Sequence, residues 1–102
     1  MHPSISAKRD RVIEICRRHH VQRLDVFGSA TGVEFDPQRS DVDLIVQFDG
    51  NAQEKLLDAY FGLKEELEAL FDRPVDLLTT ATVRNPYLRE SIERSRQTLY
   101  AA

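Results

Sequence analysis

The stretch that decides the fold is residues 41–48, which read DVDLIVQF. Its leucine, isoleucine and valine residues are typical of a buried strand. Because side chains alternate between the two faces of a strand, Asp41 and Asp43 share one face, and the alternate residues from Val42 to Phe48 share the other. Two carboxylates on one face repel each other unless a cation lies between them, and hard ions such as Mg²⁺ prefer carboxylate oxygens. The stretch therefore predicts a strand that packs on one face and binds a divalent cation on the other.

Two further strands are predicted, at Val21–Phe27 and Val75–Thr79. Asp76 interrupts the apolar run of the second of them. If its two neighbours face the core, Asp76 emerges on the opposite face, where a neighbouring strand would bring it to Asp41 and Asp43. Three carboxylates on adjacent strands can hold two metal ions about 3.5–4 Å apart, which clamp the oxygens of a phosphoryl or nucleotidyl transfer. Asp41, Asp43 and Asp76 are therefore the predicted metal ligands and catalytic residues.

A phosphate-binding corner is predicted at Gly28-Ser29, directly after the first strand. Glycine lets the backbone approach a ligand closely, and a serine at the opening of a helix offers a hydroxyl and N–H groups to an anion. Ser40, directly before the acidic pair, is included among the nucleotide-binding candidates. Alone, a Gly-Ser pair is usually a turn, and an Asp-x-Asp pair is usually solvated surface. The order of all three parts favours a site.

Helices are predicted at both ends of the chain. The first is capped by Ser4 or Ser6 and runs to about His20. The last opens at Asn85-Pro86 and carries apolar residues on one side as far as Leu99. Together with a helix predicted at Gln53–Phe71, these two helices and the three predicted strands give an α/β or α+β fold, a small mixed sheet with helices packed on it.

The longest predicted helix is Gln53–Phe71, with a wide buried face. Its apolar positions are Leu56, Leu57, Tyr60, Phe61, Leu63, Leu67, Leu70 and Phe71. Gly62 lies inside this helix at a cost of about 1 kcal/mol relative to alanine, which indicates close packing at that position.

Composition narrows the class of protein. A chain of 102 residues with 41% hydrophobic and 30% charged residues is typical of one globular domain, predicted to span residues 1–102. The net charge of −3 disfavours a nucleic-acid-binding protein. Cys16 stands alone, which excludes an internal disulfide, fits a reducing compartment and favours a core residue over a nucleophile. No signal peptide is recognised and no apolar run approaches the roughly 20 residues that span a bilayer, so a cytoplasmic protein without membrane contact is predicted.

Gly28-Ser29 followed by residues 40–44, SDVDL, resembles the signature of the polymerase-β-like nucleotidyltransferases. The short chain is similar to the minimal nucleotidyltransferases of prokaryotes, of the type that act as antitoxins beside HEPN-domain toxins. The resemblance covers nearly the whole chain and includes the strand around Asp76. It implies the polymerase-β-like nucleotidyltransferase fold.

The resemblance also implies roles for the matching residues. Asp41 and Asp43 would hold two Mg²⁺ ions, Asp76 would be the third ligand and help to activate an acceptor hydroxyl, and Gly28 and Ser29 would hold a nucleoside triphosphate. ATP would be the substrate. By the same analogy, AMP would be transferred to a hydroxyl, that of a tyrosine, on a partner HEPN toxin in a hetero-oligomer. The alternative is an antitoxin that inhibits its partner by binding alone.

The chain departs from the family pattern at one position. Many relatives carry an arginine shortly after the Gly-Ser pair, where this chain has Gly32. Arg39, Arg73 and Arg84 are the candidates to replace it. The extra helical domain with which larger relatives recognise an antibiotic or a tRNA end is also lacking, which implies that a separate protein supplies the acceptor.

Overall fold

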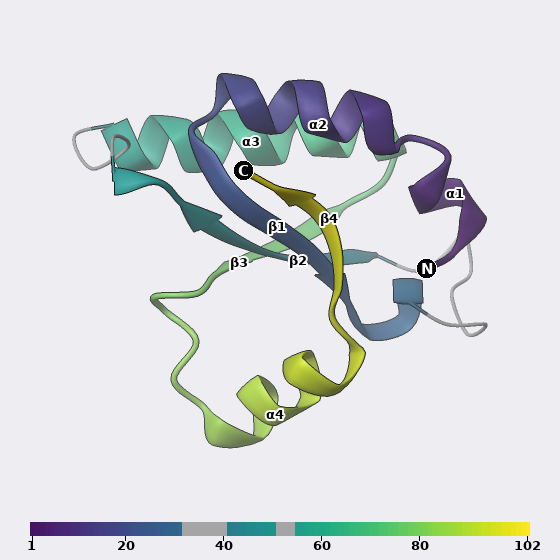
Figure 1. The fold of residues 1–102 in the computed structure, drawn as a ribbon, viewed down its shortest axis with the longest axis vertical. Coiled ribbons are helices and arrows are strands. Elements are labelled where there is room, and N and C mark those ends of the chain that lie inside the picture. Colours follow the sequence, from purple (N-terminus) through teal and green to yellow (C-terminus); the bar gives the residue numbers. More distant parts are fainter. Residues whose placement is uncertain (32–40, 51–54) are drawn as a thin grey trace.

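The computed structural model describes residues 1–31, 41–50 and 55–102, with the backbone alone for Ser29, and shows a four-stranded sheet between helices (Figure 1). In chain order the elements are α1 (Pro3–Ser6), α2 (Arg9–Arg18), β1 (Val21–Phe27), the 3₁₀ helix η1 (Gly28–Thr31), β2 (Val42–Phe48), α3 (Leu56–Phe71), β3 (Val75–Thr79), α4 (Pro86–Ser95) and β4 (Gln97–Ala101). The strand order is β3-β2-β1-β4. β2 and β3 are parallel, and β1 is antiparallel to both β2 and β4. The predicted fold class, a small mixed sheet with helices packed on it, is confirmed.

Helices α2 and α3 cover one face of the sheet (Figure 1). Val42, Leu44 and Val46 of β2 are fully buried there, in one apolar cluster with Val12 of α2 and Leu63 of α3. The predicted alternation along β2 is therefore correct, and it directs Asp43 to the opposite face.

Cys16 belongs to the same apolar cluster. Burial raises the pKa of its thiol to about 12, so the group stays protonated at neutral pH. The prediction of a core residue is confirmed.

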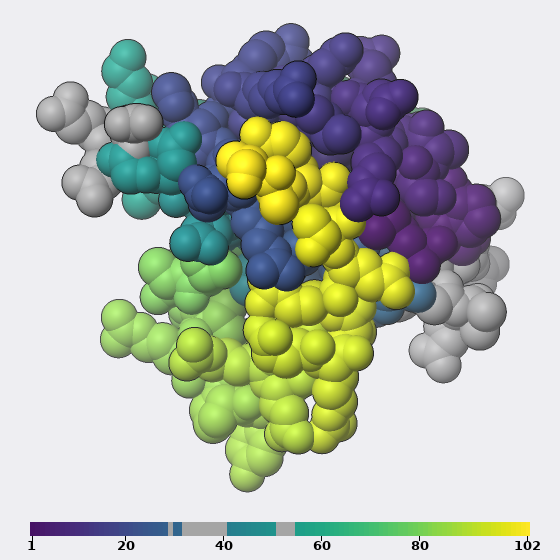
Figure 2. All heavy atoms as spheres, in the orientation of Figure 1, coloured from purple at the N-terminus to yellow at the C-terminus, as the bar shows by residue number. Residues whose placement is uncertain are grey.

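The opposite face of the sheet is covered by α4 (Figure 1). A smaller apolar cluster forms there from Phe27, Ile45, Val83 and Ile92, with Leu78 packed against it. In Figure 2, β4 lies at the front of the molecule in yellow, and α4 forms the lower part of the view. Within the described residues, this face is thus covered by the short helix α4, whereas the longer helices α2 and α3 cover the other.

The prediction of one continuous first helix was wrong. The chain forms α1 and α2, which are separated at Ala7 and Lys8. The cap is His2 rather than Ser4 or Ser6, because the His2 ring nitrogen accepts the Ser4 N–H at 3.1 Å. The Pro3 that follows has a fixed φ suited to the first helical position.

The prediction that the last helix carries Leu99 was also wrong. α4 begins as expected after Asn85, whose side chain accepts the N–H groups of Tyr87 and Leu88, but it ends at Ser95. Residues 97–101 form β4, a strand the prediction missed, and Leu99 is buried in the large cluster. β4 pairs with β1, whose backbone would otherwise be an exposed edge of the sheet.

The buried face of α3 is narrower than predicted. Leu56, Leu57 and Phe61 are 47%, 72% and 59% exposed. The reason lies at Gly62, where a Cβ atom would come within 2.8 Å of the His19 ring at the end of α2. The close packing expected at this glycine is confirmed, and the part of α3 before it extends beyond the end of α2.

The predicted helix start at Gln53 lies outside the described residues, as do Gly32, Arg39 and Ser40. None of the helices in the described part of the chain has the length and apolar character needed to cross a membrane.

Candidate metal and nucleotide site

The parallel pairing of β2 and β3 brings two of the predicted ligands together. Asp43 of β2 is in register with Asp76 of β3. Residues paired in this way point to the same face of a sheet. Val75 and Leu77, on either side of Asp76, are buried beneath the two long helices, so both carboxylates emerge on the α4 side.

Asp41 lies one residue before β2 and is exposed, as Asp76 is, whereas Asp43 is half-buried. The pKa of Asp43 is raised above its ordinary value, first by burial and then by the negative charges of Asp76 and Asp41. The three carboxylates therefore act on one another electrostatically. A proton or a cation placed among them would relieve this repulsion.

The carboxylates nevertheless do not form a closed ligand group. Within residues 1–31, 41–50 and 55–102, no three His, Cys, Asp or Glu side chains are grouped closely enough to hold a metal ion. Metal binding would require the aspartate side chains to turn toward one another. Oxygen ligands of this kind suit Mg²⁺, which keeps part of its coordination for water and substrate phosphate, so the residues fit the ion chemically.

Gly28 directly follows β1 and lies against Asp43. Its φ is +71°, a value that L side chains rarely adopt, and a Cβ atom there would lie 2.7 Å from Asp43 Oδ2. Phe27 is paired with Asp43 across the antiparallel strands, which explains this closeness. Glycine is therefore required at this position for two reasons: its backbone conformation and the space that it leaves beside the Asp43 carboxylate.

The 3₁₀ helix η1 starts at Gly28, so a short helix does open at the predicted corner. Thr31 Oγ1 donates to the Gly28 carbonyl at 2.7 Å, and the His2 N–H donates to the Ala30 carbonyl at 2.8 Å. The N-terminal residues thus hold η1 in place. Ser29 lies in η1 by its backbone.

The N–H of Gly28 is not available to a phosphate. It donates to Ser95 Oγ, at the end of α4, at 3.0 Å. Ser95 was not among the predicted site residues, because it is separated from Gly28 by 67 positions. A serine near the end of an amphipathic helix carries no local signal of such a contact.

Two of the arginines considered as replacements at Gly32 are described. Arg73 Nε donates to the Phe71 carbonyl at 3.2 Å, at the end of α3. Arg84 is exposed between β3 and α4. Neither observation identifies Arg73 or Arg84 as a phosphate-binding side chain.

Comparison with known proteins gives consistent results. The family described as nucleotidyltransferase domain matches residues 9–99. A Methanocaldococcus jannaschii protein that carries the name "putative protein adenylyltransferase" is 35% identical over 88 residues, which cover 78% of this chain and 86% of the relative.

Two solved structures have a similar fold. The first, of a "putative minimal nucleotidyltransferase", has a TM-score of 0.75 and 32% identity, with 95% of each chain covered. The second is a complex of tri-AMPylated Shewanella oneidensis HEPN toxin with MNT antitoxin, with a TM-score of 0.62, 19% identity, and 94% of this chain and 71% of that chain covered.

Proposed function

The chain belongs to the nucleotidyltransferase domain family, and from this premise we propose that it is a protein adenylyltransferase that transfers AMP from ATP to a hydroxyl group of a separate protein. The observation that carries the proposal is the register of Asp43 with Asp76 beside Gly28. The name of the M. jannaschii relative supports the same activity.

Asp41, Asp43 and Asp76 are the residues that would hold Mg²⁺, two ions in all. When bound, Mg²⁺ supplies positive charge that neutralises the triphosphate and the charge that develops during transfer. Gly28 leaves the space in which a phosphate can approach Asp43. Ser29, the next residue in the chain, and Ser40, which directly precedes the acidic pair in the sequence, are proposed to bind the nucleotide with it. The contribution of these residues is mostly positioning and electrostatic stabilisation.

Asp76 is proposed to take part in the proton transfer. The acceptor oxygen attacks the α-phosphorus of ATP in line, its proton passes to Asp76, and pyrophosphate leaves. Asp76 suits this role because it is exposed and lies on β3, an edge strand of the sheet. A hydroxyl on a large partner can reach such a position without entering a closed cavity.

The partner is proposed to be a HEPN toxin, the acceptor one of its tyrosine hydroxyls, and the complex a hetero-oligomer in which the chain acts as antitoxin. Support comes from the solved complex of an AMPylated HEPN toxin with MNT antitoxin, because a chain of that complex has a fold similar to that of this chain. Under this proposal, the transferred nucleotide silences the toxin.

Transfer can be tested directly by incubating the protein with α-labelled ATP, Mg²⁺ and the HEPN toxin proposed as its partner. Wild-type protein should label the toxin and raise its mass by one or more AMP units. Asp76→Asn should reduce the rate by about 10²–10⁴-fold, the usual contribution of a general base.

The matched control is Asp72→Asn, because Asp72 is an exposed aspartate just before β3 and asparagine tolerates its left-handed φ of 53°. This control should transfer at the wild-type rate. Silencing of the toxin by wild type and Asp76→Asn alike, with no change in toxin mass, would instead establish inhibition by binding alone.

A further inference from the structure

The hydroxyl of Ser95 is fixed from two sides. It accepts the Gly28 N–H at 3.0 Å and donates to the Ser91 carbonyl, one turn earlier in α4, at 3.2 Å. Its hydrogen cannot point at Gly28 while it makes the second bond, so the oxygen lone pair is directed to the Gly28 N–H. A single hydroxyl therefore connects α4 to the first residue of η1.

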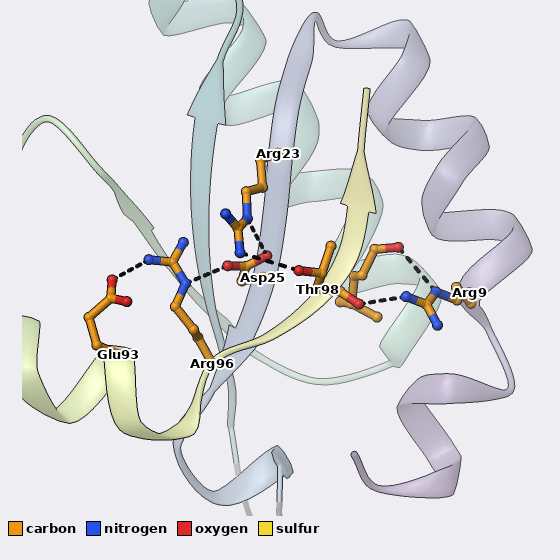
Figure 3. A network of polar contacts seen from close by, with 7 residues as sticks. Arg9, Arg23, Asp25, Glu93, Arg96 and Thr98 are labelled. Atoms are coloured by element: carbon orange, nitrogen blue, oxygen red, sulfur yellow. Dashed lines mark hydrogen bonds and ion pairs between the residues drawn. The ribbon is translucent and has the colours of Figure 1, made fainter.

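The end of α4 is itself held by a partly buried ion pair. Arg96, the residue after α4, places its Nε 2.5 Å from Asp25 Oδ2, and Asp25 is fully buried on β1 (Figure 3). Arg23 Nε donates to the other oxygen of Asp25 at 3.0 Å, and Arg96 also donates to Glu93 Oε1 at 2.5 Å. Burial lowers the pKa of Arg96, but the contacts with Asp25 and Glu93 outweigh this effect and raise it.

The Ser95–Gly28 hydrogen bond and the Arg96–Asp25 ion pair both join the end of α4 to the last part of β1 and the residue that follows it. Asp25 lies three residues before Gly28 on β1, and Ser95 is adjacent to Arg96. The ion pair thus fixes where α4 ends relative to β1, and the Ser95 hydroxyl then meets the Gly28 N–H. Since a Cβ atom at Gly28 would lie 2.7 Å from Asp43 Oδ2, even a small shift of this backbone changes the space beside the carboxylate.

We propose that Ser95 is a positioning residue for the nucleotide: its hydroxyl holds Gly28, and with it η1, at the distance from Asp43 that leaves room for a phosphate. The Asp25–Arg96 pair sets the place of Ser95. This inference rests on the proposed function, because it assigns a purpose to the geometry of the same site. A purely structural role for Ser95 would stabilise α4 without affecting nucleotide affinity.

Ser95→Ala tests the proposal, with Ser95→Thr as the conservative variant. Threonine in a helix can place its hydroxyl toward the carbonyl four residues earlier, as Ser95 does. The matched control is Ser91→Ala, which removes an exposed hydroxyl one turn away and leaves the Ser91 carbonyl in place. Thermal unfolding would establish that all variants are folded.

Two quantities would be measured: the affinity for ATP with Mg²⁺ by calorimetry, and the hydrogen-exchange rate of the Gly28 amide by NMR. Ser95→Ala should weaken ATP binding by about 3–10-fold and speed Gly28 exchange by a similar factor, the range expected for one neutral hydrogen bond. Ser95→Thr should restore both values, and Ser91→Ala should change neither. In the transfer assay the loss should appear in KM for ATP rather than in kcat.

Equal ATP affinity in wild type and folded Ser95→Ala would overturn the inference and leave the proposed function intact. Absence of ATP binding by the wild type would overturn the proposed function and, with it, the assignment of Ser95 to nucleotide binding. In that case an accelerated Gly28 amide in Ser95→Ala would support the backbone-holding part of the inference, and an unchanged amide would overturn that part too.

Discussion

The two faces of the sheet are built from the same strands but differ in what they bury. Toward α2 and α3, β2 presents Val42, Leu44 and Val46 to a large apolar cluster. Toward α4 it presents Asp43 and Ile45, next to a much smaller cluster. The first face supplies stability, because buried apolar area stabilises at about 25 cal/mol per Å². The second face carries the features that cost stability, a carboxylate of raised pKa and a backbone that requires glycine.

The largest effect on stability is expected on the face covered by two helices. Leu63→Ala should lower the free energy of unfolding by about 2–5 kcal/mol, because Leu63 is fully buried and truncation leaves a cavity. Leu78→Ala, the matched change on the α4 face, should cost less because Leu78 is only partly buried. Urea denaturation of both variants would measure the difference. A cost at Leu78 equal to that at Leu63 would contradict the division between the faces.

A smaller effect on stability, combined with a loss of function, is expected at Gly28. Gly28→Ala should lower the free energy of unfolding by about 1–2 kcal/mol, because alanine at a positive φ carries a penalty of that size. It should also displace Asp43, against which the new methyl group would press, and abolish binding of ATP with Mg²⁺.

Gly50→Ala is the control for this change, because a Cβ atom at Gly50 meets nothing within 4 Å and Gly50 has no positive φ. It should retain wild-type stability to within about 0.5 kcal/mol and bind ATP normally. Calorimetry and denaturation of the two variants would check both effects. Normal ATP binding by Gly28→Ala would mean that this glycine serves the turn alone.

The smallest effect expected is a gain in stability at Asp43. Its raised pKa means that the folded protein keeps a proton at pH values where the unfolded chain has lost it. Without metal, stability should therefore fall as the pH rises from the ordinary carboxyl value of 3.8 through the raised value of the folded state. Asp43→Asn should be more stable than wild type at neutral pH in EDTA, and this advantage should shrink as the pH approaches 3.8.

Thermal unfolding of both proteins across this pH range would measure the difference. The Asp72→Asn variant, which removes an exposed aspartate outside the site, is the control for the substitution itself. An Asp43→Asn variant less stable than wild type at neutral pH would show that the carboxylate makes favourable contacts in the metal-free protein.

Strands β1, β2 and β3 and the acidic face were predictable from the sequence because they depend on local alternation, whereas β4 was not. β1 and β3 have the predicted bounds, and β2 differs from its prediction only at Asp41. The family and the enzyme class, a nucleotidyltransferase, were also predicted correctly, since the Gly-Ser and Asp-x-Asp motifs lie close together in the chain.

What the sequence could not predict depends on contacts between distant segments. The spacing of Leu88, Ile92 and Leu99 is compatible with one helix, and only the pairing of residues 97–101 with β1 makes Leu99 part of a strand. Exposure of Leu57 depends on where α2 ends beside α3. The contact between Ser95 and Gly28 depends on the same docking of the C-terminal segment, so no local pattern could reveal it.

Calorimetric titration of ATP with Mg²⁺ decides whether the acidic side of β2 binds the metal–nucleotide complex. The double variant Asp41→Asn/Asp43→Asn would be compared with wild type under identical conditions, after denaturation has shown that it is folded. We expect binding by wild type and no measurable binding by the double variant, which should be as stable as wild type or slightly more stable. Wild-type affinity in the folded double variant would contradict the assignment of Asp41 and Asp43 to the metal site.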